Sequence, residues 1–453
     1  MKKQVLMCAP FNTRSGYGDH ARSIFYSIMD RDDLEIKCVD VRWGETPRNH
    51  LDPKIPKHKK LLDTFIDGQN VQQPDIYIDI RIPNEFQTPA KFNIGITAGV
   101  ETDVVSPEFI NGCNQMNLTL TTSKFTMETF QKCAYDQMKD MPDGSKKSTG
   151  VLKLDRPMGV LSEGIDTSIY KPIKDAGKSD DPFKKEIYDL VKESFLFLHV
   201  GQWGKGGYGE DRKNIALMIK TFIQAFANQP NPPALLLKTN GADFSILDRK
   251  ETVDKIKQIK DQFKELDSVP NIYLLHGDLT LEQMALLYNL PKVKAMLSCT
   301  HGEGFGRPLA EATCCDLPVI ASNWSGQLDF LNPKQSVMID GELKPIPKKL
   351  IWKPIIVEPG KWFNVSEPDV VNKLRIFQKN HKVIKNNAKK LGIWNRSKFS
   401  LTAMAKEFNT ILDNAIKSIP ETPQPMSLKL PKLTKKKNSK PATIKLPKLK
   451  KVT

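Results

Sequence analysis

The feature that most constrains the fold is a regular alternation of short apolar segments with longer amphipathic ones. Short apolar runs occur at 4–10, 35–41, 76–80, 92–98 and 118–122, and again at 195–200, 234–238, 271–275, 295–298 and 318–321. Helical periodicity marks 19–29, 212–227, 251–266, 280–289 and 307–314. Short apolar strands alternating with helices are typical of parallel sheets covered on both faces. The sequence therefore predicts an α/β protein with two doubly wound, Rossmann-like sheets.

The two series of segments divide the chain into successive parts. We predict a Rossmann-like domain over 1–172, a polar linker over 173–193, a second Rossmann-like domain over 194–395 and a helix over 396–419 that packs back toward the first domain. Asp19 is the predicted N-cap of the first helix. Parallel sheets of this kind bind ligands at the carboxyl ends of their strands. We therefore expect the functional site in a cleft between the two domains.

The remaining segment, 420–453, differs from the rest in composition. The chain carries a net charge of +16, and this segment holds ten lysines against a single acid, Glu421. Its prolines forbid a continuous helix and its like charges repel one another. We predict a disordered basic tail. Electrostatic contact with nucleic acid or with an anionic membrane, and docking to another protein, are its alternative functions.

Composition excludes several classes of protein. The chain of 453 residues is 39% hydrophobic with a mean hydropathy of −0.41, and it contains no apolar run long enough for a membrane helix. The apolar segment after Met1 ends at Pro10, which is too short for a signal peptide. The seven cysteines form no Cys-x-x-Cys pair and predict reduced thiols. We expect a cytoplasmic protein, with peripheral attachment to an anionic membrane surface as the alternative.

The segment 301–312 is the strongest functional signal. It follows a predicted strand and begins a predicted helix, and Gly304 and Gly306 allow unusual backbone dihedral angles there. Pro308 suits the first helical turn, where no amide hydrogen is needed. The exposed amides of 305–307 would point at an anion, because helix N-termini carry unpaired N–H groups and a partial positive charge. The sequence therefore predicts a phosphate site at this helix N-terminus.

Two carboxylates frame the glycines. Glu303 lies in the loop before the helix and Glu311 lies within the helix. We expect them to flank one ligand from different depths. Glu-Gly-Phe-Gly-Arg-Pro-Leu-Ala-Glu over 303–311 resembles the Glu-x7-Glu motif of retaining glycosyltransferases of family four, which have the GT-B fold of two Rossmann-like domains facing across a cleft.

Other segments are similar to the same family. They are Gly16-Tyr17-Gly18, Ser123-Lys124-Phe125, Gly164-Ile165-Asp166 with Tyr170-Lys171-Pro172, and Asp211-Arg212-Lys213. The resemblance covers residues 1–418 and leaves out only the tail. It implies that the first domain binds an acceptor and the second binds a nucleoside-diphosphate sugar.

The resemblance also implies roles for individual residues. Glu303 would contact the transferring sugar and Lys213 would neutralise the diphosphate, so these two are the predicted catalytic residues. Glu311 would hold the ribose hydroxyls. The other predicted donor-binding residues are Gly304, Phe305, Gly306, Arg212, Gly16 and Gly18, and Glu101 is the predicted polar group on the acceptor side.

One residue departs from the family pattern. Gln202 follows the glycine at the end of a strand, where many members have an arginine. Either Arg212 or Lys205 supplies the missing charge, or stabilisation of the leaving group is weaker. We also find no Asp-x-Asp motif after a predicted strand. The acidic pair Asp180–Asp181 falls in the predicted linker. We therefore expect neither a metal ion nor a cofactor. The co-substrate would be a nucleoside-diphosphate sugar, with UDP or GDP as the favoured nucleotide.

The predicted function is transfer of a hexose-type sugar to an acceptor hydroxyl, with retention of configuration. The acceptor would be a glycan, a lipid-linked sugar, a protein or a modified nucleic acid. Two alternatives remain at this point. The chain could be a catalytically weak or inactive module of the same fold that binds a nucleotide or glycan, or a transferase tethered to nucleic acid by its tail.

Overall fold

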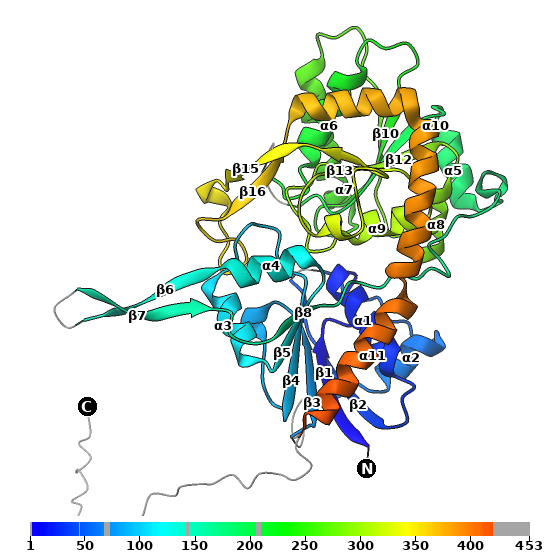
Figure 1. Ribbon diagram of the computed structural model, residues 1–453. Coiled ribbons are helices and arrows are strands. Elements are labelled where there is room, and N and C mark those ends of the chain that lie inside the picture. Colours follow the sequence, from blue (N-terminus) through cyan, green and yellow to red (C-terminus); the bar gives the residue numbers. More distant parts are fainter. Residues whose placement is uncertain (1, 45, 68–72, 142–144, 205–209, 420–453) are drawn as a thin grey trace, which may run out of the picture. The chain divides into compact units, whose positions relative to one another are not determined.

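The computed structural model describes residues 2–44, 46–67, 73–141, 145–204 and 210–419. The predicted basic tail, 420–453, lies outside the described residues. The chain up to Ile419 forms one compact unit. It contains two six-stranded parallel sheets, each with its own helices (Figure 1). We call the part around the first sheet the N-lobe and the part around the second sheet the C-lobe.

The N-lobe sheet has the strand order β2-β1-β3-β4-β5-β8, with every pairing parallel. Its strands are β1 (Lys3–Ala9), β2 (Leu34–Asp40), β3 (Ile76–Ile80), β4 (Phe92–Thr97), β5 (Leu118–Thr121) and β8 (Met158–Val160). Its helices are α1 (Gly16–Ile28), α2 (Pro56–Leu62), α3 (Pro107–Gln115) and α4 (Lys124–Lys132). The strand order reverses beside β1, so the carboxyl end of β1 is a topological switch point, where such sheets bind ligands.

The C-lobe sheet has the order β11-β10-β9-β12-β13-β14 and is also entirely parallel. Its strands are β9 (Leu196–Val200), β10 (Ala234–Lys238), β11 (Ile272–Leu275), β12 (Val293–Ser298), β13 (Val319–Ser322) and β14 (Val337–Ile339). Its helices are α5 (Pro182–Leu190), α6 (Ile215–Phe226), α7 (Ile246–Lys260), α8 (Leu281–Asn289), α9 (Arg307–Cys314) and α10 (Glu367–Lys398). Its switch point lies between β9 and β12.

The predicted architecture of two doubly wound sheets is confirmed, but several helix boundaries differ from the prediction. The predicted N-cap Asp19 is wrong: α1 begins at Gly16, because the Ser15 hydroxyl accepts a hydrogen bond from the Gly18 amide. Helix α6 begins at Ile215 instead of at residue 212, because Asn214 has a positive φ of 53°. Helix α7 begins at Ile246, after the N-cap Ser245.

Some elements were not predicted at all. A β-ribbon of β6 (Ala134–Asp140) and β7 (Lys146–Lys153) extends from the N-lobe, and a second one pairs β15 (Gly341–Pro345) with β16 (Lys361–Val365) (Figure 1). Strands β6 and β7 consist mostly of polar and charged residues, and they and the exposed β15 lack the apolar runs of sheet strands, whereas β16 carries buried Trp362, Phe363 and Val365. Helix α5 lies in the segment predicted as a linker, and α10 follows the second ribbon.

The last helix, α11 (Leu401–Lys417), returns to the N-lobe. Its Met404, Phe408 and Leu412 are buried in the same apolar cluster as Ile24 and Phe25 of α1. Their spacing of four residues places them on one face of the helix. Complete burial of such side chains contributes about 1.5–3 kcal/mol each, so α11 fastens the C-terminal segment to the first sheet.

Two further observations concern the predicted class of protein. Among the residues that the structure describes, no helix combines the length and the apolar character needed to span a lipid bilayer. All seven cysteines are buried free thiols.

Candidate functional site

Helix α9 and the loop before it form the centre of the candidate site. The helix begins at Arg307 as predicted, and its N-cap Gly306 has a φ of +96°, a conformation that favours glycine. Pro308 lies in the first turn. Within the described part of the chain, the amides of 304–307 donate to no acceptor. Four unpaired N–H groups therefore gather at this helix N-terminus, which is suited to an anion.

The glycines before α9 also allow the two lobes to approach each other. A Cβ atom on Gly304 would lie 1.8 Å from the carbonyl oxygen of Ala98, and one on Gly302 would lie 2.4 Å from that of Glu101. Both positions face the N-lobe loop that follows β4. We expected Gly304 to make room for a ligand, whereas here its missing side chain admits the opposing backbone. Close packing between lobes is thus a second reason for glycine at this position.

Lys213 and Glu303 meet in the C-lobe. The Lys213 ammonium nitrogen lies 2.5 Å from Glu303 Oε1, and both side chains are largely buried. Burial would raise the pKa of Glu303, but the positive charges of Lys213 and Arg212 lower it below its ordinary value. Glu303 is therefore ionised at neutral pH. The pair places one cation and one anion beside the N-terminus of α9.

Local backbone structure explains how Lys213 reaches Glu303. The left-handed residue Asn214 ends the turn that carries Lys213, and the Asp211 carboxylate accepts the Ile215 amide at the start of α6. The carbonyl oxygen of Arg212 accepts hydrogen bonds from the amide of His301 and the hydroxyl of Thr300. The turn before α6 is thus bonded directly to the loop that contains Glu303.

Arg212 itself crosses to the N-lobe. Its guanidinium forms an ion pair with Glu101, the residue predicted on the acceptor side. The two predicted residues are therefore brought together, although each was assigned to a different substrate. We call Glu101, Arg212, Lys213 and Glu303 the paired cluster, because each carboxylate in it has its own cation.

A second charged cluster surrounds Arg307. The Arg307 guanidinium lies 3.1 Å from Glu311 of its own helix and 3.4 Å from Glu163 of the N-lobe. Asp19, which also pairs with Arg22, lies 4.0 Å from Arg307. The hydroxyl of Tyr288 donates to Glu311 over 3.4 Å. We call Asp19, Glu163, Arg307 and Glu311 the shared cluster, because several carboxylates share one guanidinium.

The shared cluster has unusual protonation. Burial raises the pKa of Glu311 to about 7, and the negative charges of Asp19 and Glu163 add to that effect against the opposing influence of Arg307. Burial likewise raises the pKa of Glu163 to about 7. Two carboxylates that change charge near neutral pH in one buried place are typical of functional sites.

The first-turn glycines of α1 have separate roles. Gly16 and Gly18 precede the predicted helix start at residue 19, but both belong to the helix. The Gly18 amide is already bonded to Ser15, and a Cβ there would lie 2.5 Å from the carbonyl oxygen of Thr13. Gly18 is therefore required by local packing and has no free amide to offer. Gly16 has open space beside its Cα, so it retains the predicted role as a hypothesis.

The remaining predicted residues divide between core and surface. The Phe305 ring is buried against Phe330 and Phe399, so only its backbone can face a ligand. Gln202 is exposed, and its amide nitrogen donates to the carbonyl oxygen of Gly241 over 2.6 Å. Lys205, the suggested source of compensating charge, lies outside the described residues.

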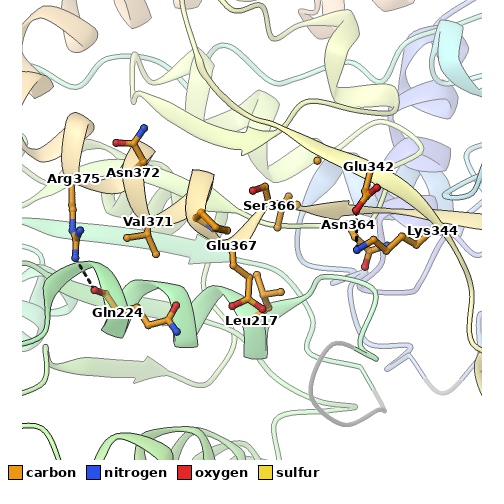
Figure 2. A pocket seen from close by; sticks show the side chains of 13 residues that line it. Leu217, Gln224, Glu342, Lys344, Asn364, Ser366, Glu367, Val371, Asn372 and Arg375 are labelled. Atoms are coloured by element: carbon orange, nitrogen blue, oxygen red, sulfur yellow. Dashed lines mark hydrogen bonds and ion pairs between the residues drawn. The ribbon is translucent and has the colours of Figure 1, made fainter.

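A surface hollow lies away from these residues. It measures about 1090 Å³ and is formed by α6, the start of α10 and the β15–β16 ribbon (Figure 2). None of the predicted site residues lines it. The Arg375 guanidinium at its edge donates to the carbonyl oxygen of Gln224, near the end of α6. The candidate site therefore rests on charge and backbone geometry and not on this hollow.

Sequence reasoning missed three members of the shared cluster. Asp19 was interpreted as a helix cap, Arg307 only as a source of a backbone amide, and Glu163 was not singled out. A signal was present for two of them: Arg307 lies between the two framing carboxylates, and Glu163 directly precedes the Gly164-Ile165-Asp166 segment. Nothing in the local sequence indicates that they meet.

Comparison with known proteins gives one family match. Residues 184–345 match the family model described as Glycosyl transferases group 1. The matched segment is just over a third of the chain and contains Arg212, Lys213, Glu303 and Glu311. No curated protein is significantly similar to the full sequence.

Solved structures share the fold over nearly the whole chain. Sucrose-phosphate synthase from Thermosynechococcus elongatus aligns with a TM-score of 0.60 and 10% identity, covering 92% of this chain and 100% of its own. HepE from Anabaena, in complex with UDP and glucose, gives 0.58 and 12%, covering 91% and 100%. A glycosyltransferase from Rickettsia africae gives 0.58 and 14%, covering 92% and 99%. The chain therefore has the predicted GT-B fold.

Proposed function

We propose that the chain transfers a hexose-type sugar from a nucleoside-diphosphate sugar to an acceptor hydroxyl, with retention of configuration and without a metal ion. One observation carries the proposal. The Lys213–Glu303 pair adjoins the unpaired amides at the start of α9, on the side of the C-lobe that contacts the N-lobe. The match to Glycosyl transferases group 1 supports the same class of reaction.

The diphosphate would be held by fixed donors and cations. A lysine ammonium has three N–H donors, so Lys213 can retain Glu303 and still bind a phosphate oxygen. The amides of 304–307 supply further donors without reorganisation, and such preorganised donors stabilise developing negative charge most effectively. Arg212 would add a second positive charge on release from Glu101. These groups offset the charge of the leaving diphosphate in the place that a metal would otherwise occupy.

Bond making and breaking then occur at the anomeric carbon of the donor. The acceptor hydroxyl oxygen forms a bond to the anomeric carbon while the bond between that carbon and the β-phosphate oxygen breaks. The hydroxyl attacks on the face from which the phosphate departs, so the configuration is preserved. Its proton passes to the departing phosphate oxygen on that face. Ionised Glu303 would accept hydrogen bonds from the sugar hydroxyls and stabilise the positive charge that develops on the ring.

Glu311 would bind the donor at its other end. A carboxylate accepts hydrogen bonds from ribose hydroxyls most strongly when it is ionised. Because Glu311 has a pKa of about 7, donor binding by this residue should strengthen as the pH rises through neutrality. UDP-glucose is the first donor to test, since HepE was crystallised with UDP and glucose.

A donor screen tests the proposal directly. Melting temperature is measured with UDP, GDP and ADP and with their sugars, and release of nucleoside diphosphate is then measured over a panel of acceptors in EDTA. We expect stabilisation by one nucleotide class and turnover that EDTA leaves unchanged. Product stereochemistry follows from NMR of the anomeric proton. Failure of every nucleotide to stabilise the chain would overturn the proposal.

Substitutions in the two framing carboxylates assign their roles. Glu303→Ala should mainly lower kcat, whereas Glu311→Ala should mainly raise the Kd for the donor. Exposed Glu251→Ala on α7 is the matched control. Unchanged kinetics in both site variants would disprove the assignment of both residues.

A second candidate function is a binding module of the same fold without turnover. One observation favours it: the side chain at position 202 is a neutral glutamine hydrogen-bonded to Gly241, so the cation expected there is missing. Nucleotide binding without release of nucleoside diphosphate, over a broad acceptor panel, would support this candidate. The other alternative, a transferase tethered to nucleic acid by its tail, depends on residues that lie outside the described part of the chain.

A further inference from the structure

Within residues 1–419, the excess of positive charge is concentrated in one segment. Residues 370–398, which belong to α10, carry seven lysines and two arginines without one aspartate or glutamate. The other residues of 1–419 carry 49 lysines and arginines against 51 acids. The whole positive excess of the compact unit therefore lies on this single helix.

The fold leaves most of that charge on the surface. Helix α10 bends where Asn380 has non-helical dihedral angles, and Figure 1 shows its second part running along the edge of the C-lobe. The inner side of this part holds Ala388, Leu391 and Asn395, which are buried. Arg396 pairs with Asp316. Within the described residues, no carboxylate pairs with the exposed lysines, which are 379, 382, 385, 389, 390 and 398.

Large apolar side chains are exposed among these lysines. Val383 is 65% exposed, Ile393 is 64% exposed and Trp394 is 46% exposed. At 100° per residue, Val383 and Trp394 fall within about 20° of each other on the helix surface, and Lys390 falls beside them. The Trp394 ring packs edge-on against Phe399, with the ring centroids 5.4 Å apart, so it is held in place on the surface. Lysines 382 and 389 lie together along one flank of this face, and Ile393 lies between them and Lys390, about 80° from Val383.

A hollow adjoins the same face. It measures about 570 Å³ and is lined by Asn332, Pro333, Lys334, Gln335, Asn387 and Lys390. Two ammonium groups and three side-chain amides therefore border a recess beside the exposed apolar residues. These groups are suited to hydrogen-bonding the oxygens of a phosphate. We call the exposed residues 382, 383, 389, 390, 393 and 394, with this hollow, the α10 face.

We propose that the α10 face binds the surface of an anionic phospholipid membrane. The lysines and the hollow would bind lipid phosphates, while Val383, Ile393 and Trp394 would enter the boundary between headgroups and acyl chains. Helices that lie in a membrane interface combine these features: apolar and tryptophan side chains on one face, flanked by lysines. The second part of α10, from 381 to 398, is about 27 Å long at 1.5 Å per residue, which suffices for contact with several lipids.

The apolar residues distinguish a membrane from other partners. Binding to a nucleic acid backbone requires cations, but it gives no reason for exposed aliphatic side chains among the lysines of the face. A second copy of the chain would bring the same positive charges into contact in a symmetric dimer, and like charges repel. Charge complementarity and apolar exposure together therefore favour an anionic lipid surface. This inference does not depend on the proposed transferase activity.

Vesicle sedimentation with the full chain tests the proposal. Vesicles of phosphatidylcholine alone are compared with vesicles that contain phosphatidylglycerol as one third of the lipid. We expect binding only to the anionic vesicles. Lys389→Glu/Lys390→Glu should weaken that binding by at least about tenfold, because each lysine near an anionic surface contributes substantially. Val383→Ser/Ile393→Ser should weaken it by about fivefold or more at unchanged net charge.

The matched control is Lys250→Glu/Lys257→Glu on α7, which makes the same change in net charge at exposed lysines. The tail is present in every variant, so a difference between the two lysine pairs reports on the α10 face alone. Equal binding by both pairs would overturn the proposal, as would absence of binding by the unaltered chain. Loss of duplex DNA binding by the α10 pair, with vesicle binding retained, would assign the face to nucleic acid instead. Circular dichroism checks that each variant is folded.

Discussion

The two charged clusters beside α9 differ in how their charges are matched. In the paired cluster, Glu303 has Lys213 and Glu101 has Arg212. In the shared cluster, Glu163 and Glu311 depend on the single guanidinium of Arg307, and Asp19 is held mainly by Arg22. Both clusters join the N-lobe to the C-lobe. The difference lies in the number of cations available to each buried carboxylate.

This difference contributes to the charge states of the two framing carboxylates, Glu303 and Glu311. A neighbouring cation favours the charged form of an acid, while burial and nearby anions disfavour it. The pKa of Glu303 is accordingly lowered, whereas burial raises that of Glu311 to about 7. The two framing carboxylates of one motif are therefore expected to differ in charge at neutral pH. The contrast belongs to these two residues and not to every member of the clusters: burial raises the pKa of Glu101 despite its pairing with Arg212, whereas Arg22 and Arg307 lower the pKa of Asp19 against the effect of burial.

Removal of Arg307 should have the largest effect on stability. Arg307→Met leaves Glu163 and Glu311 buried without a cation, and an uncompensated buried charge costs about 3–5 kcal/mol. The free energy of unfolding, measured by urea titration, should fall by that amount at about pH 8 and by less at about pH 5.5, where both acids are protonated. Exposed Arg249→Met on α7 is the control. An equal loss at both pH values would contradict the shared-charge interpretation.

Removal of Lys213 should have the largest effect on turnover. Lys213→Met takes one cation from the paired cluster and from the proposed diphosphate site. If the proposed function holds, kcat should fall by about 10²–10³, the usual cost of removing one preorganised donor to developing negative charge. Steady-state kinetics with the donor identified in the screen measure this, with exposed Lys257→Met as the control. A change in KM alone would place Lys213 in binding and not in catalysis.

The stability of the chain should depend on pH through the shared cluster. Glu163 and Glu311 have folded pKa values of about 7, above the usual value of 4.5. The folded state therefore retains protons that the unfolded state releases between these values, so this contribution to stability is lost as the pH rises from about 4.5 through 7. Urea titrations at a series of pH values should show the decline. Glu163→Gln should flatten it, while Glu85→Gln, at an exposed site, should not.

Restoring the missing cation should have the smallest effect. Gln202→Arg introduces a charge that can keep the hydrogen bond to the Gly241 carbonyl oxygen and also reach toward the diphosphate. We expect the Kd for the nucleoside diphosphate to fall by about threefold to tenfold, since an exposed ion pair contributes about 1 kcal/mol. Isothermal titration calorimetry measures it. Weaker binding in the variant would mean that Gln202 lies away from the diphosphate.

The fold was more predictable than the site. Ten of the twelve strands in the two sheets follow predicted apolar runs of four to seven residues, whereas the short edge strands β8 and β14 were not predicted. Helix α9 begins at Arg307 because Gly306 and Pro308 specify a helix start there. Helix α10 was not predicted: its outer side holds lysines with exposed Val383 and Ile393, which obscures the buried periodicity. The residues of the paired cluster were all predicted individually, but the pairing of Arg212 with Glu101 was not.

The sequence by itself determined the features that depend on near neighbours: alternation of strands and helices, the glycine cap of α9 and the unpaired amides behind it. These follow from periodicity and backbone dihedral angles within a few residues. Only the tertiary structure decided which carboxylate meets which cation. Asp19 and Glu163 reach Arg307 from another lobe, and Gly304 packs against Ala98, because contact between the lobes brings together residues more than a hundred positions apart. The charge state of Glu311 therefore depends on burial and on distant partners that no local pattern records.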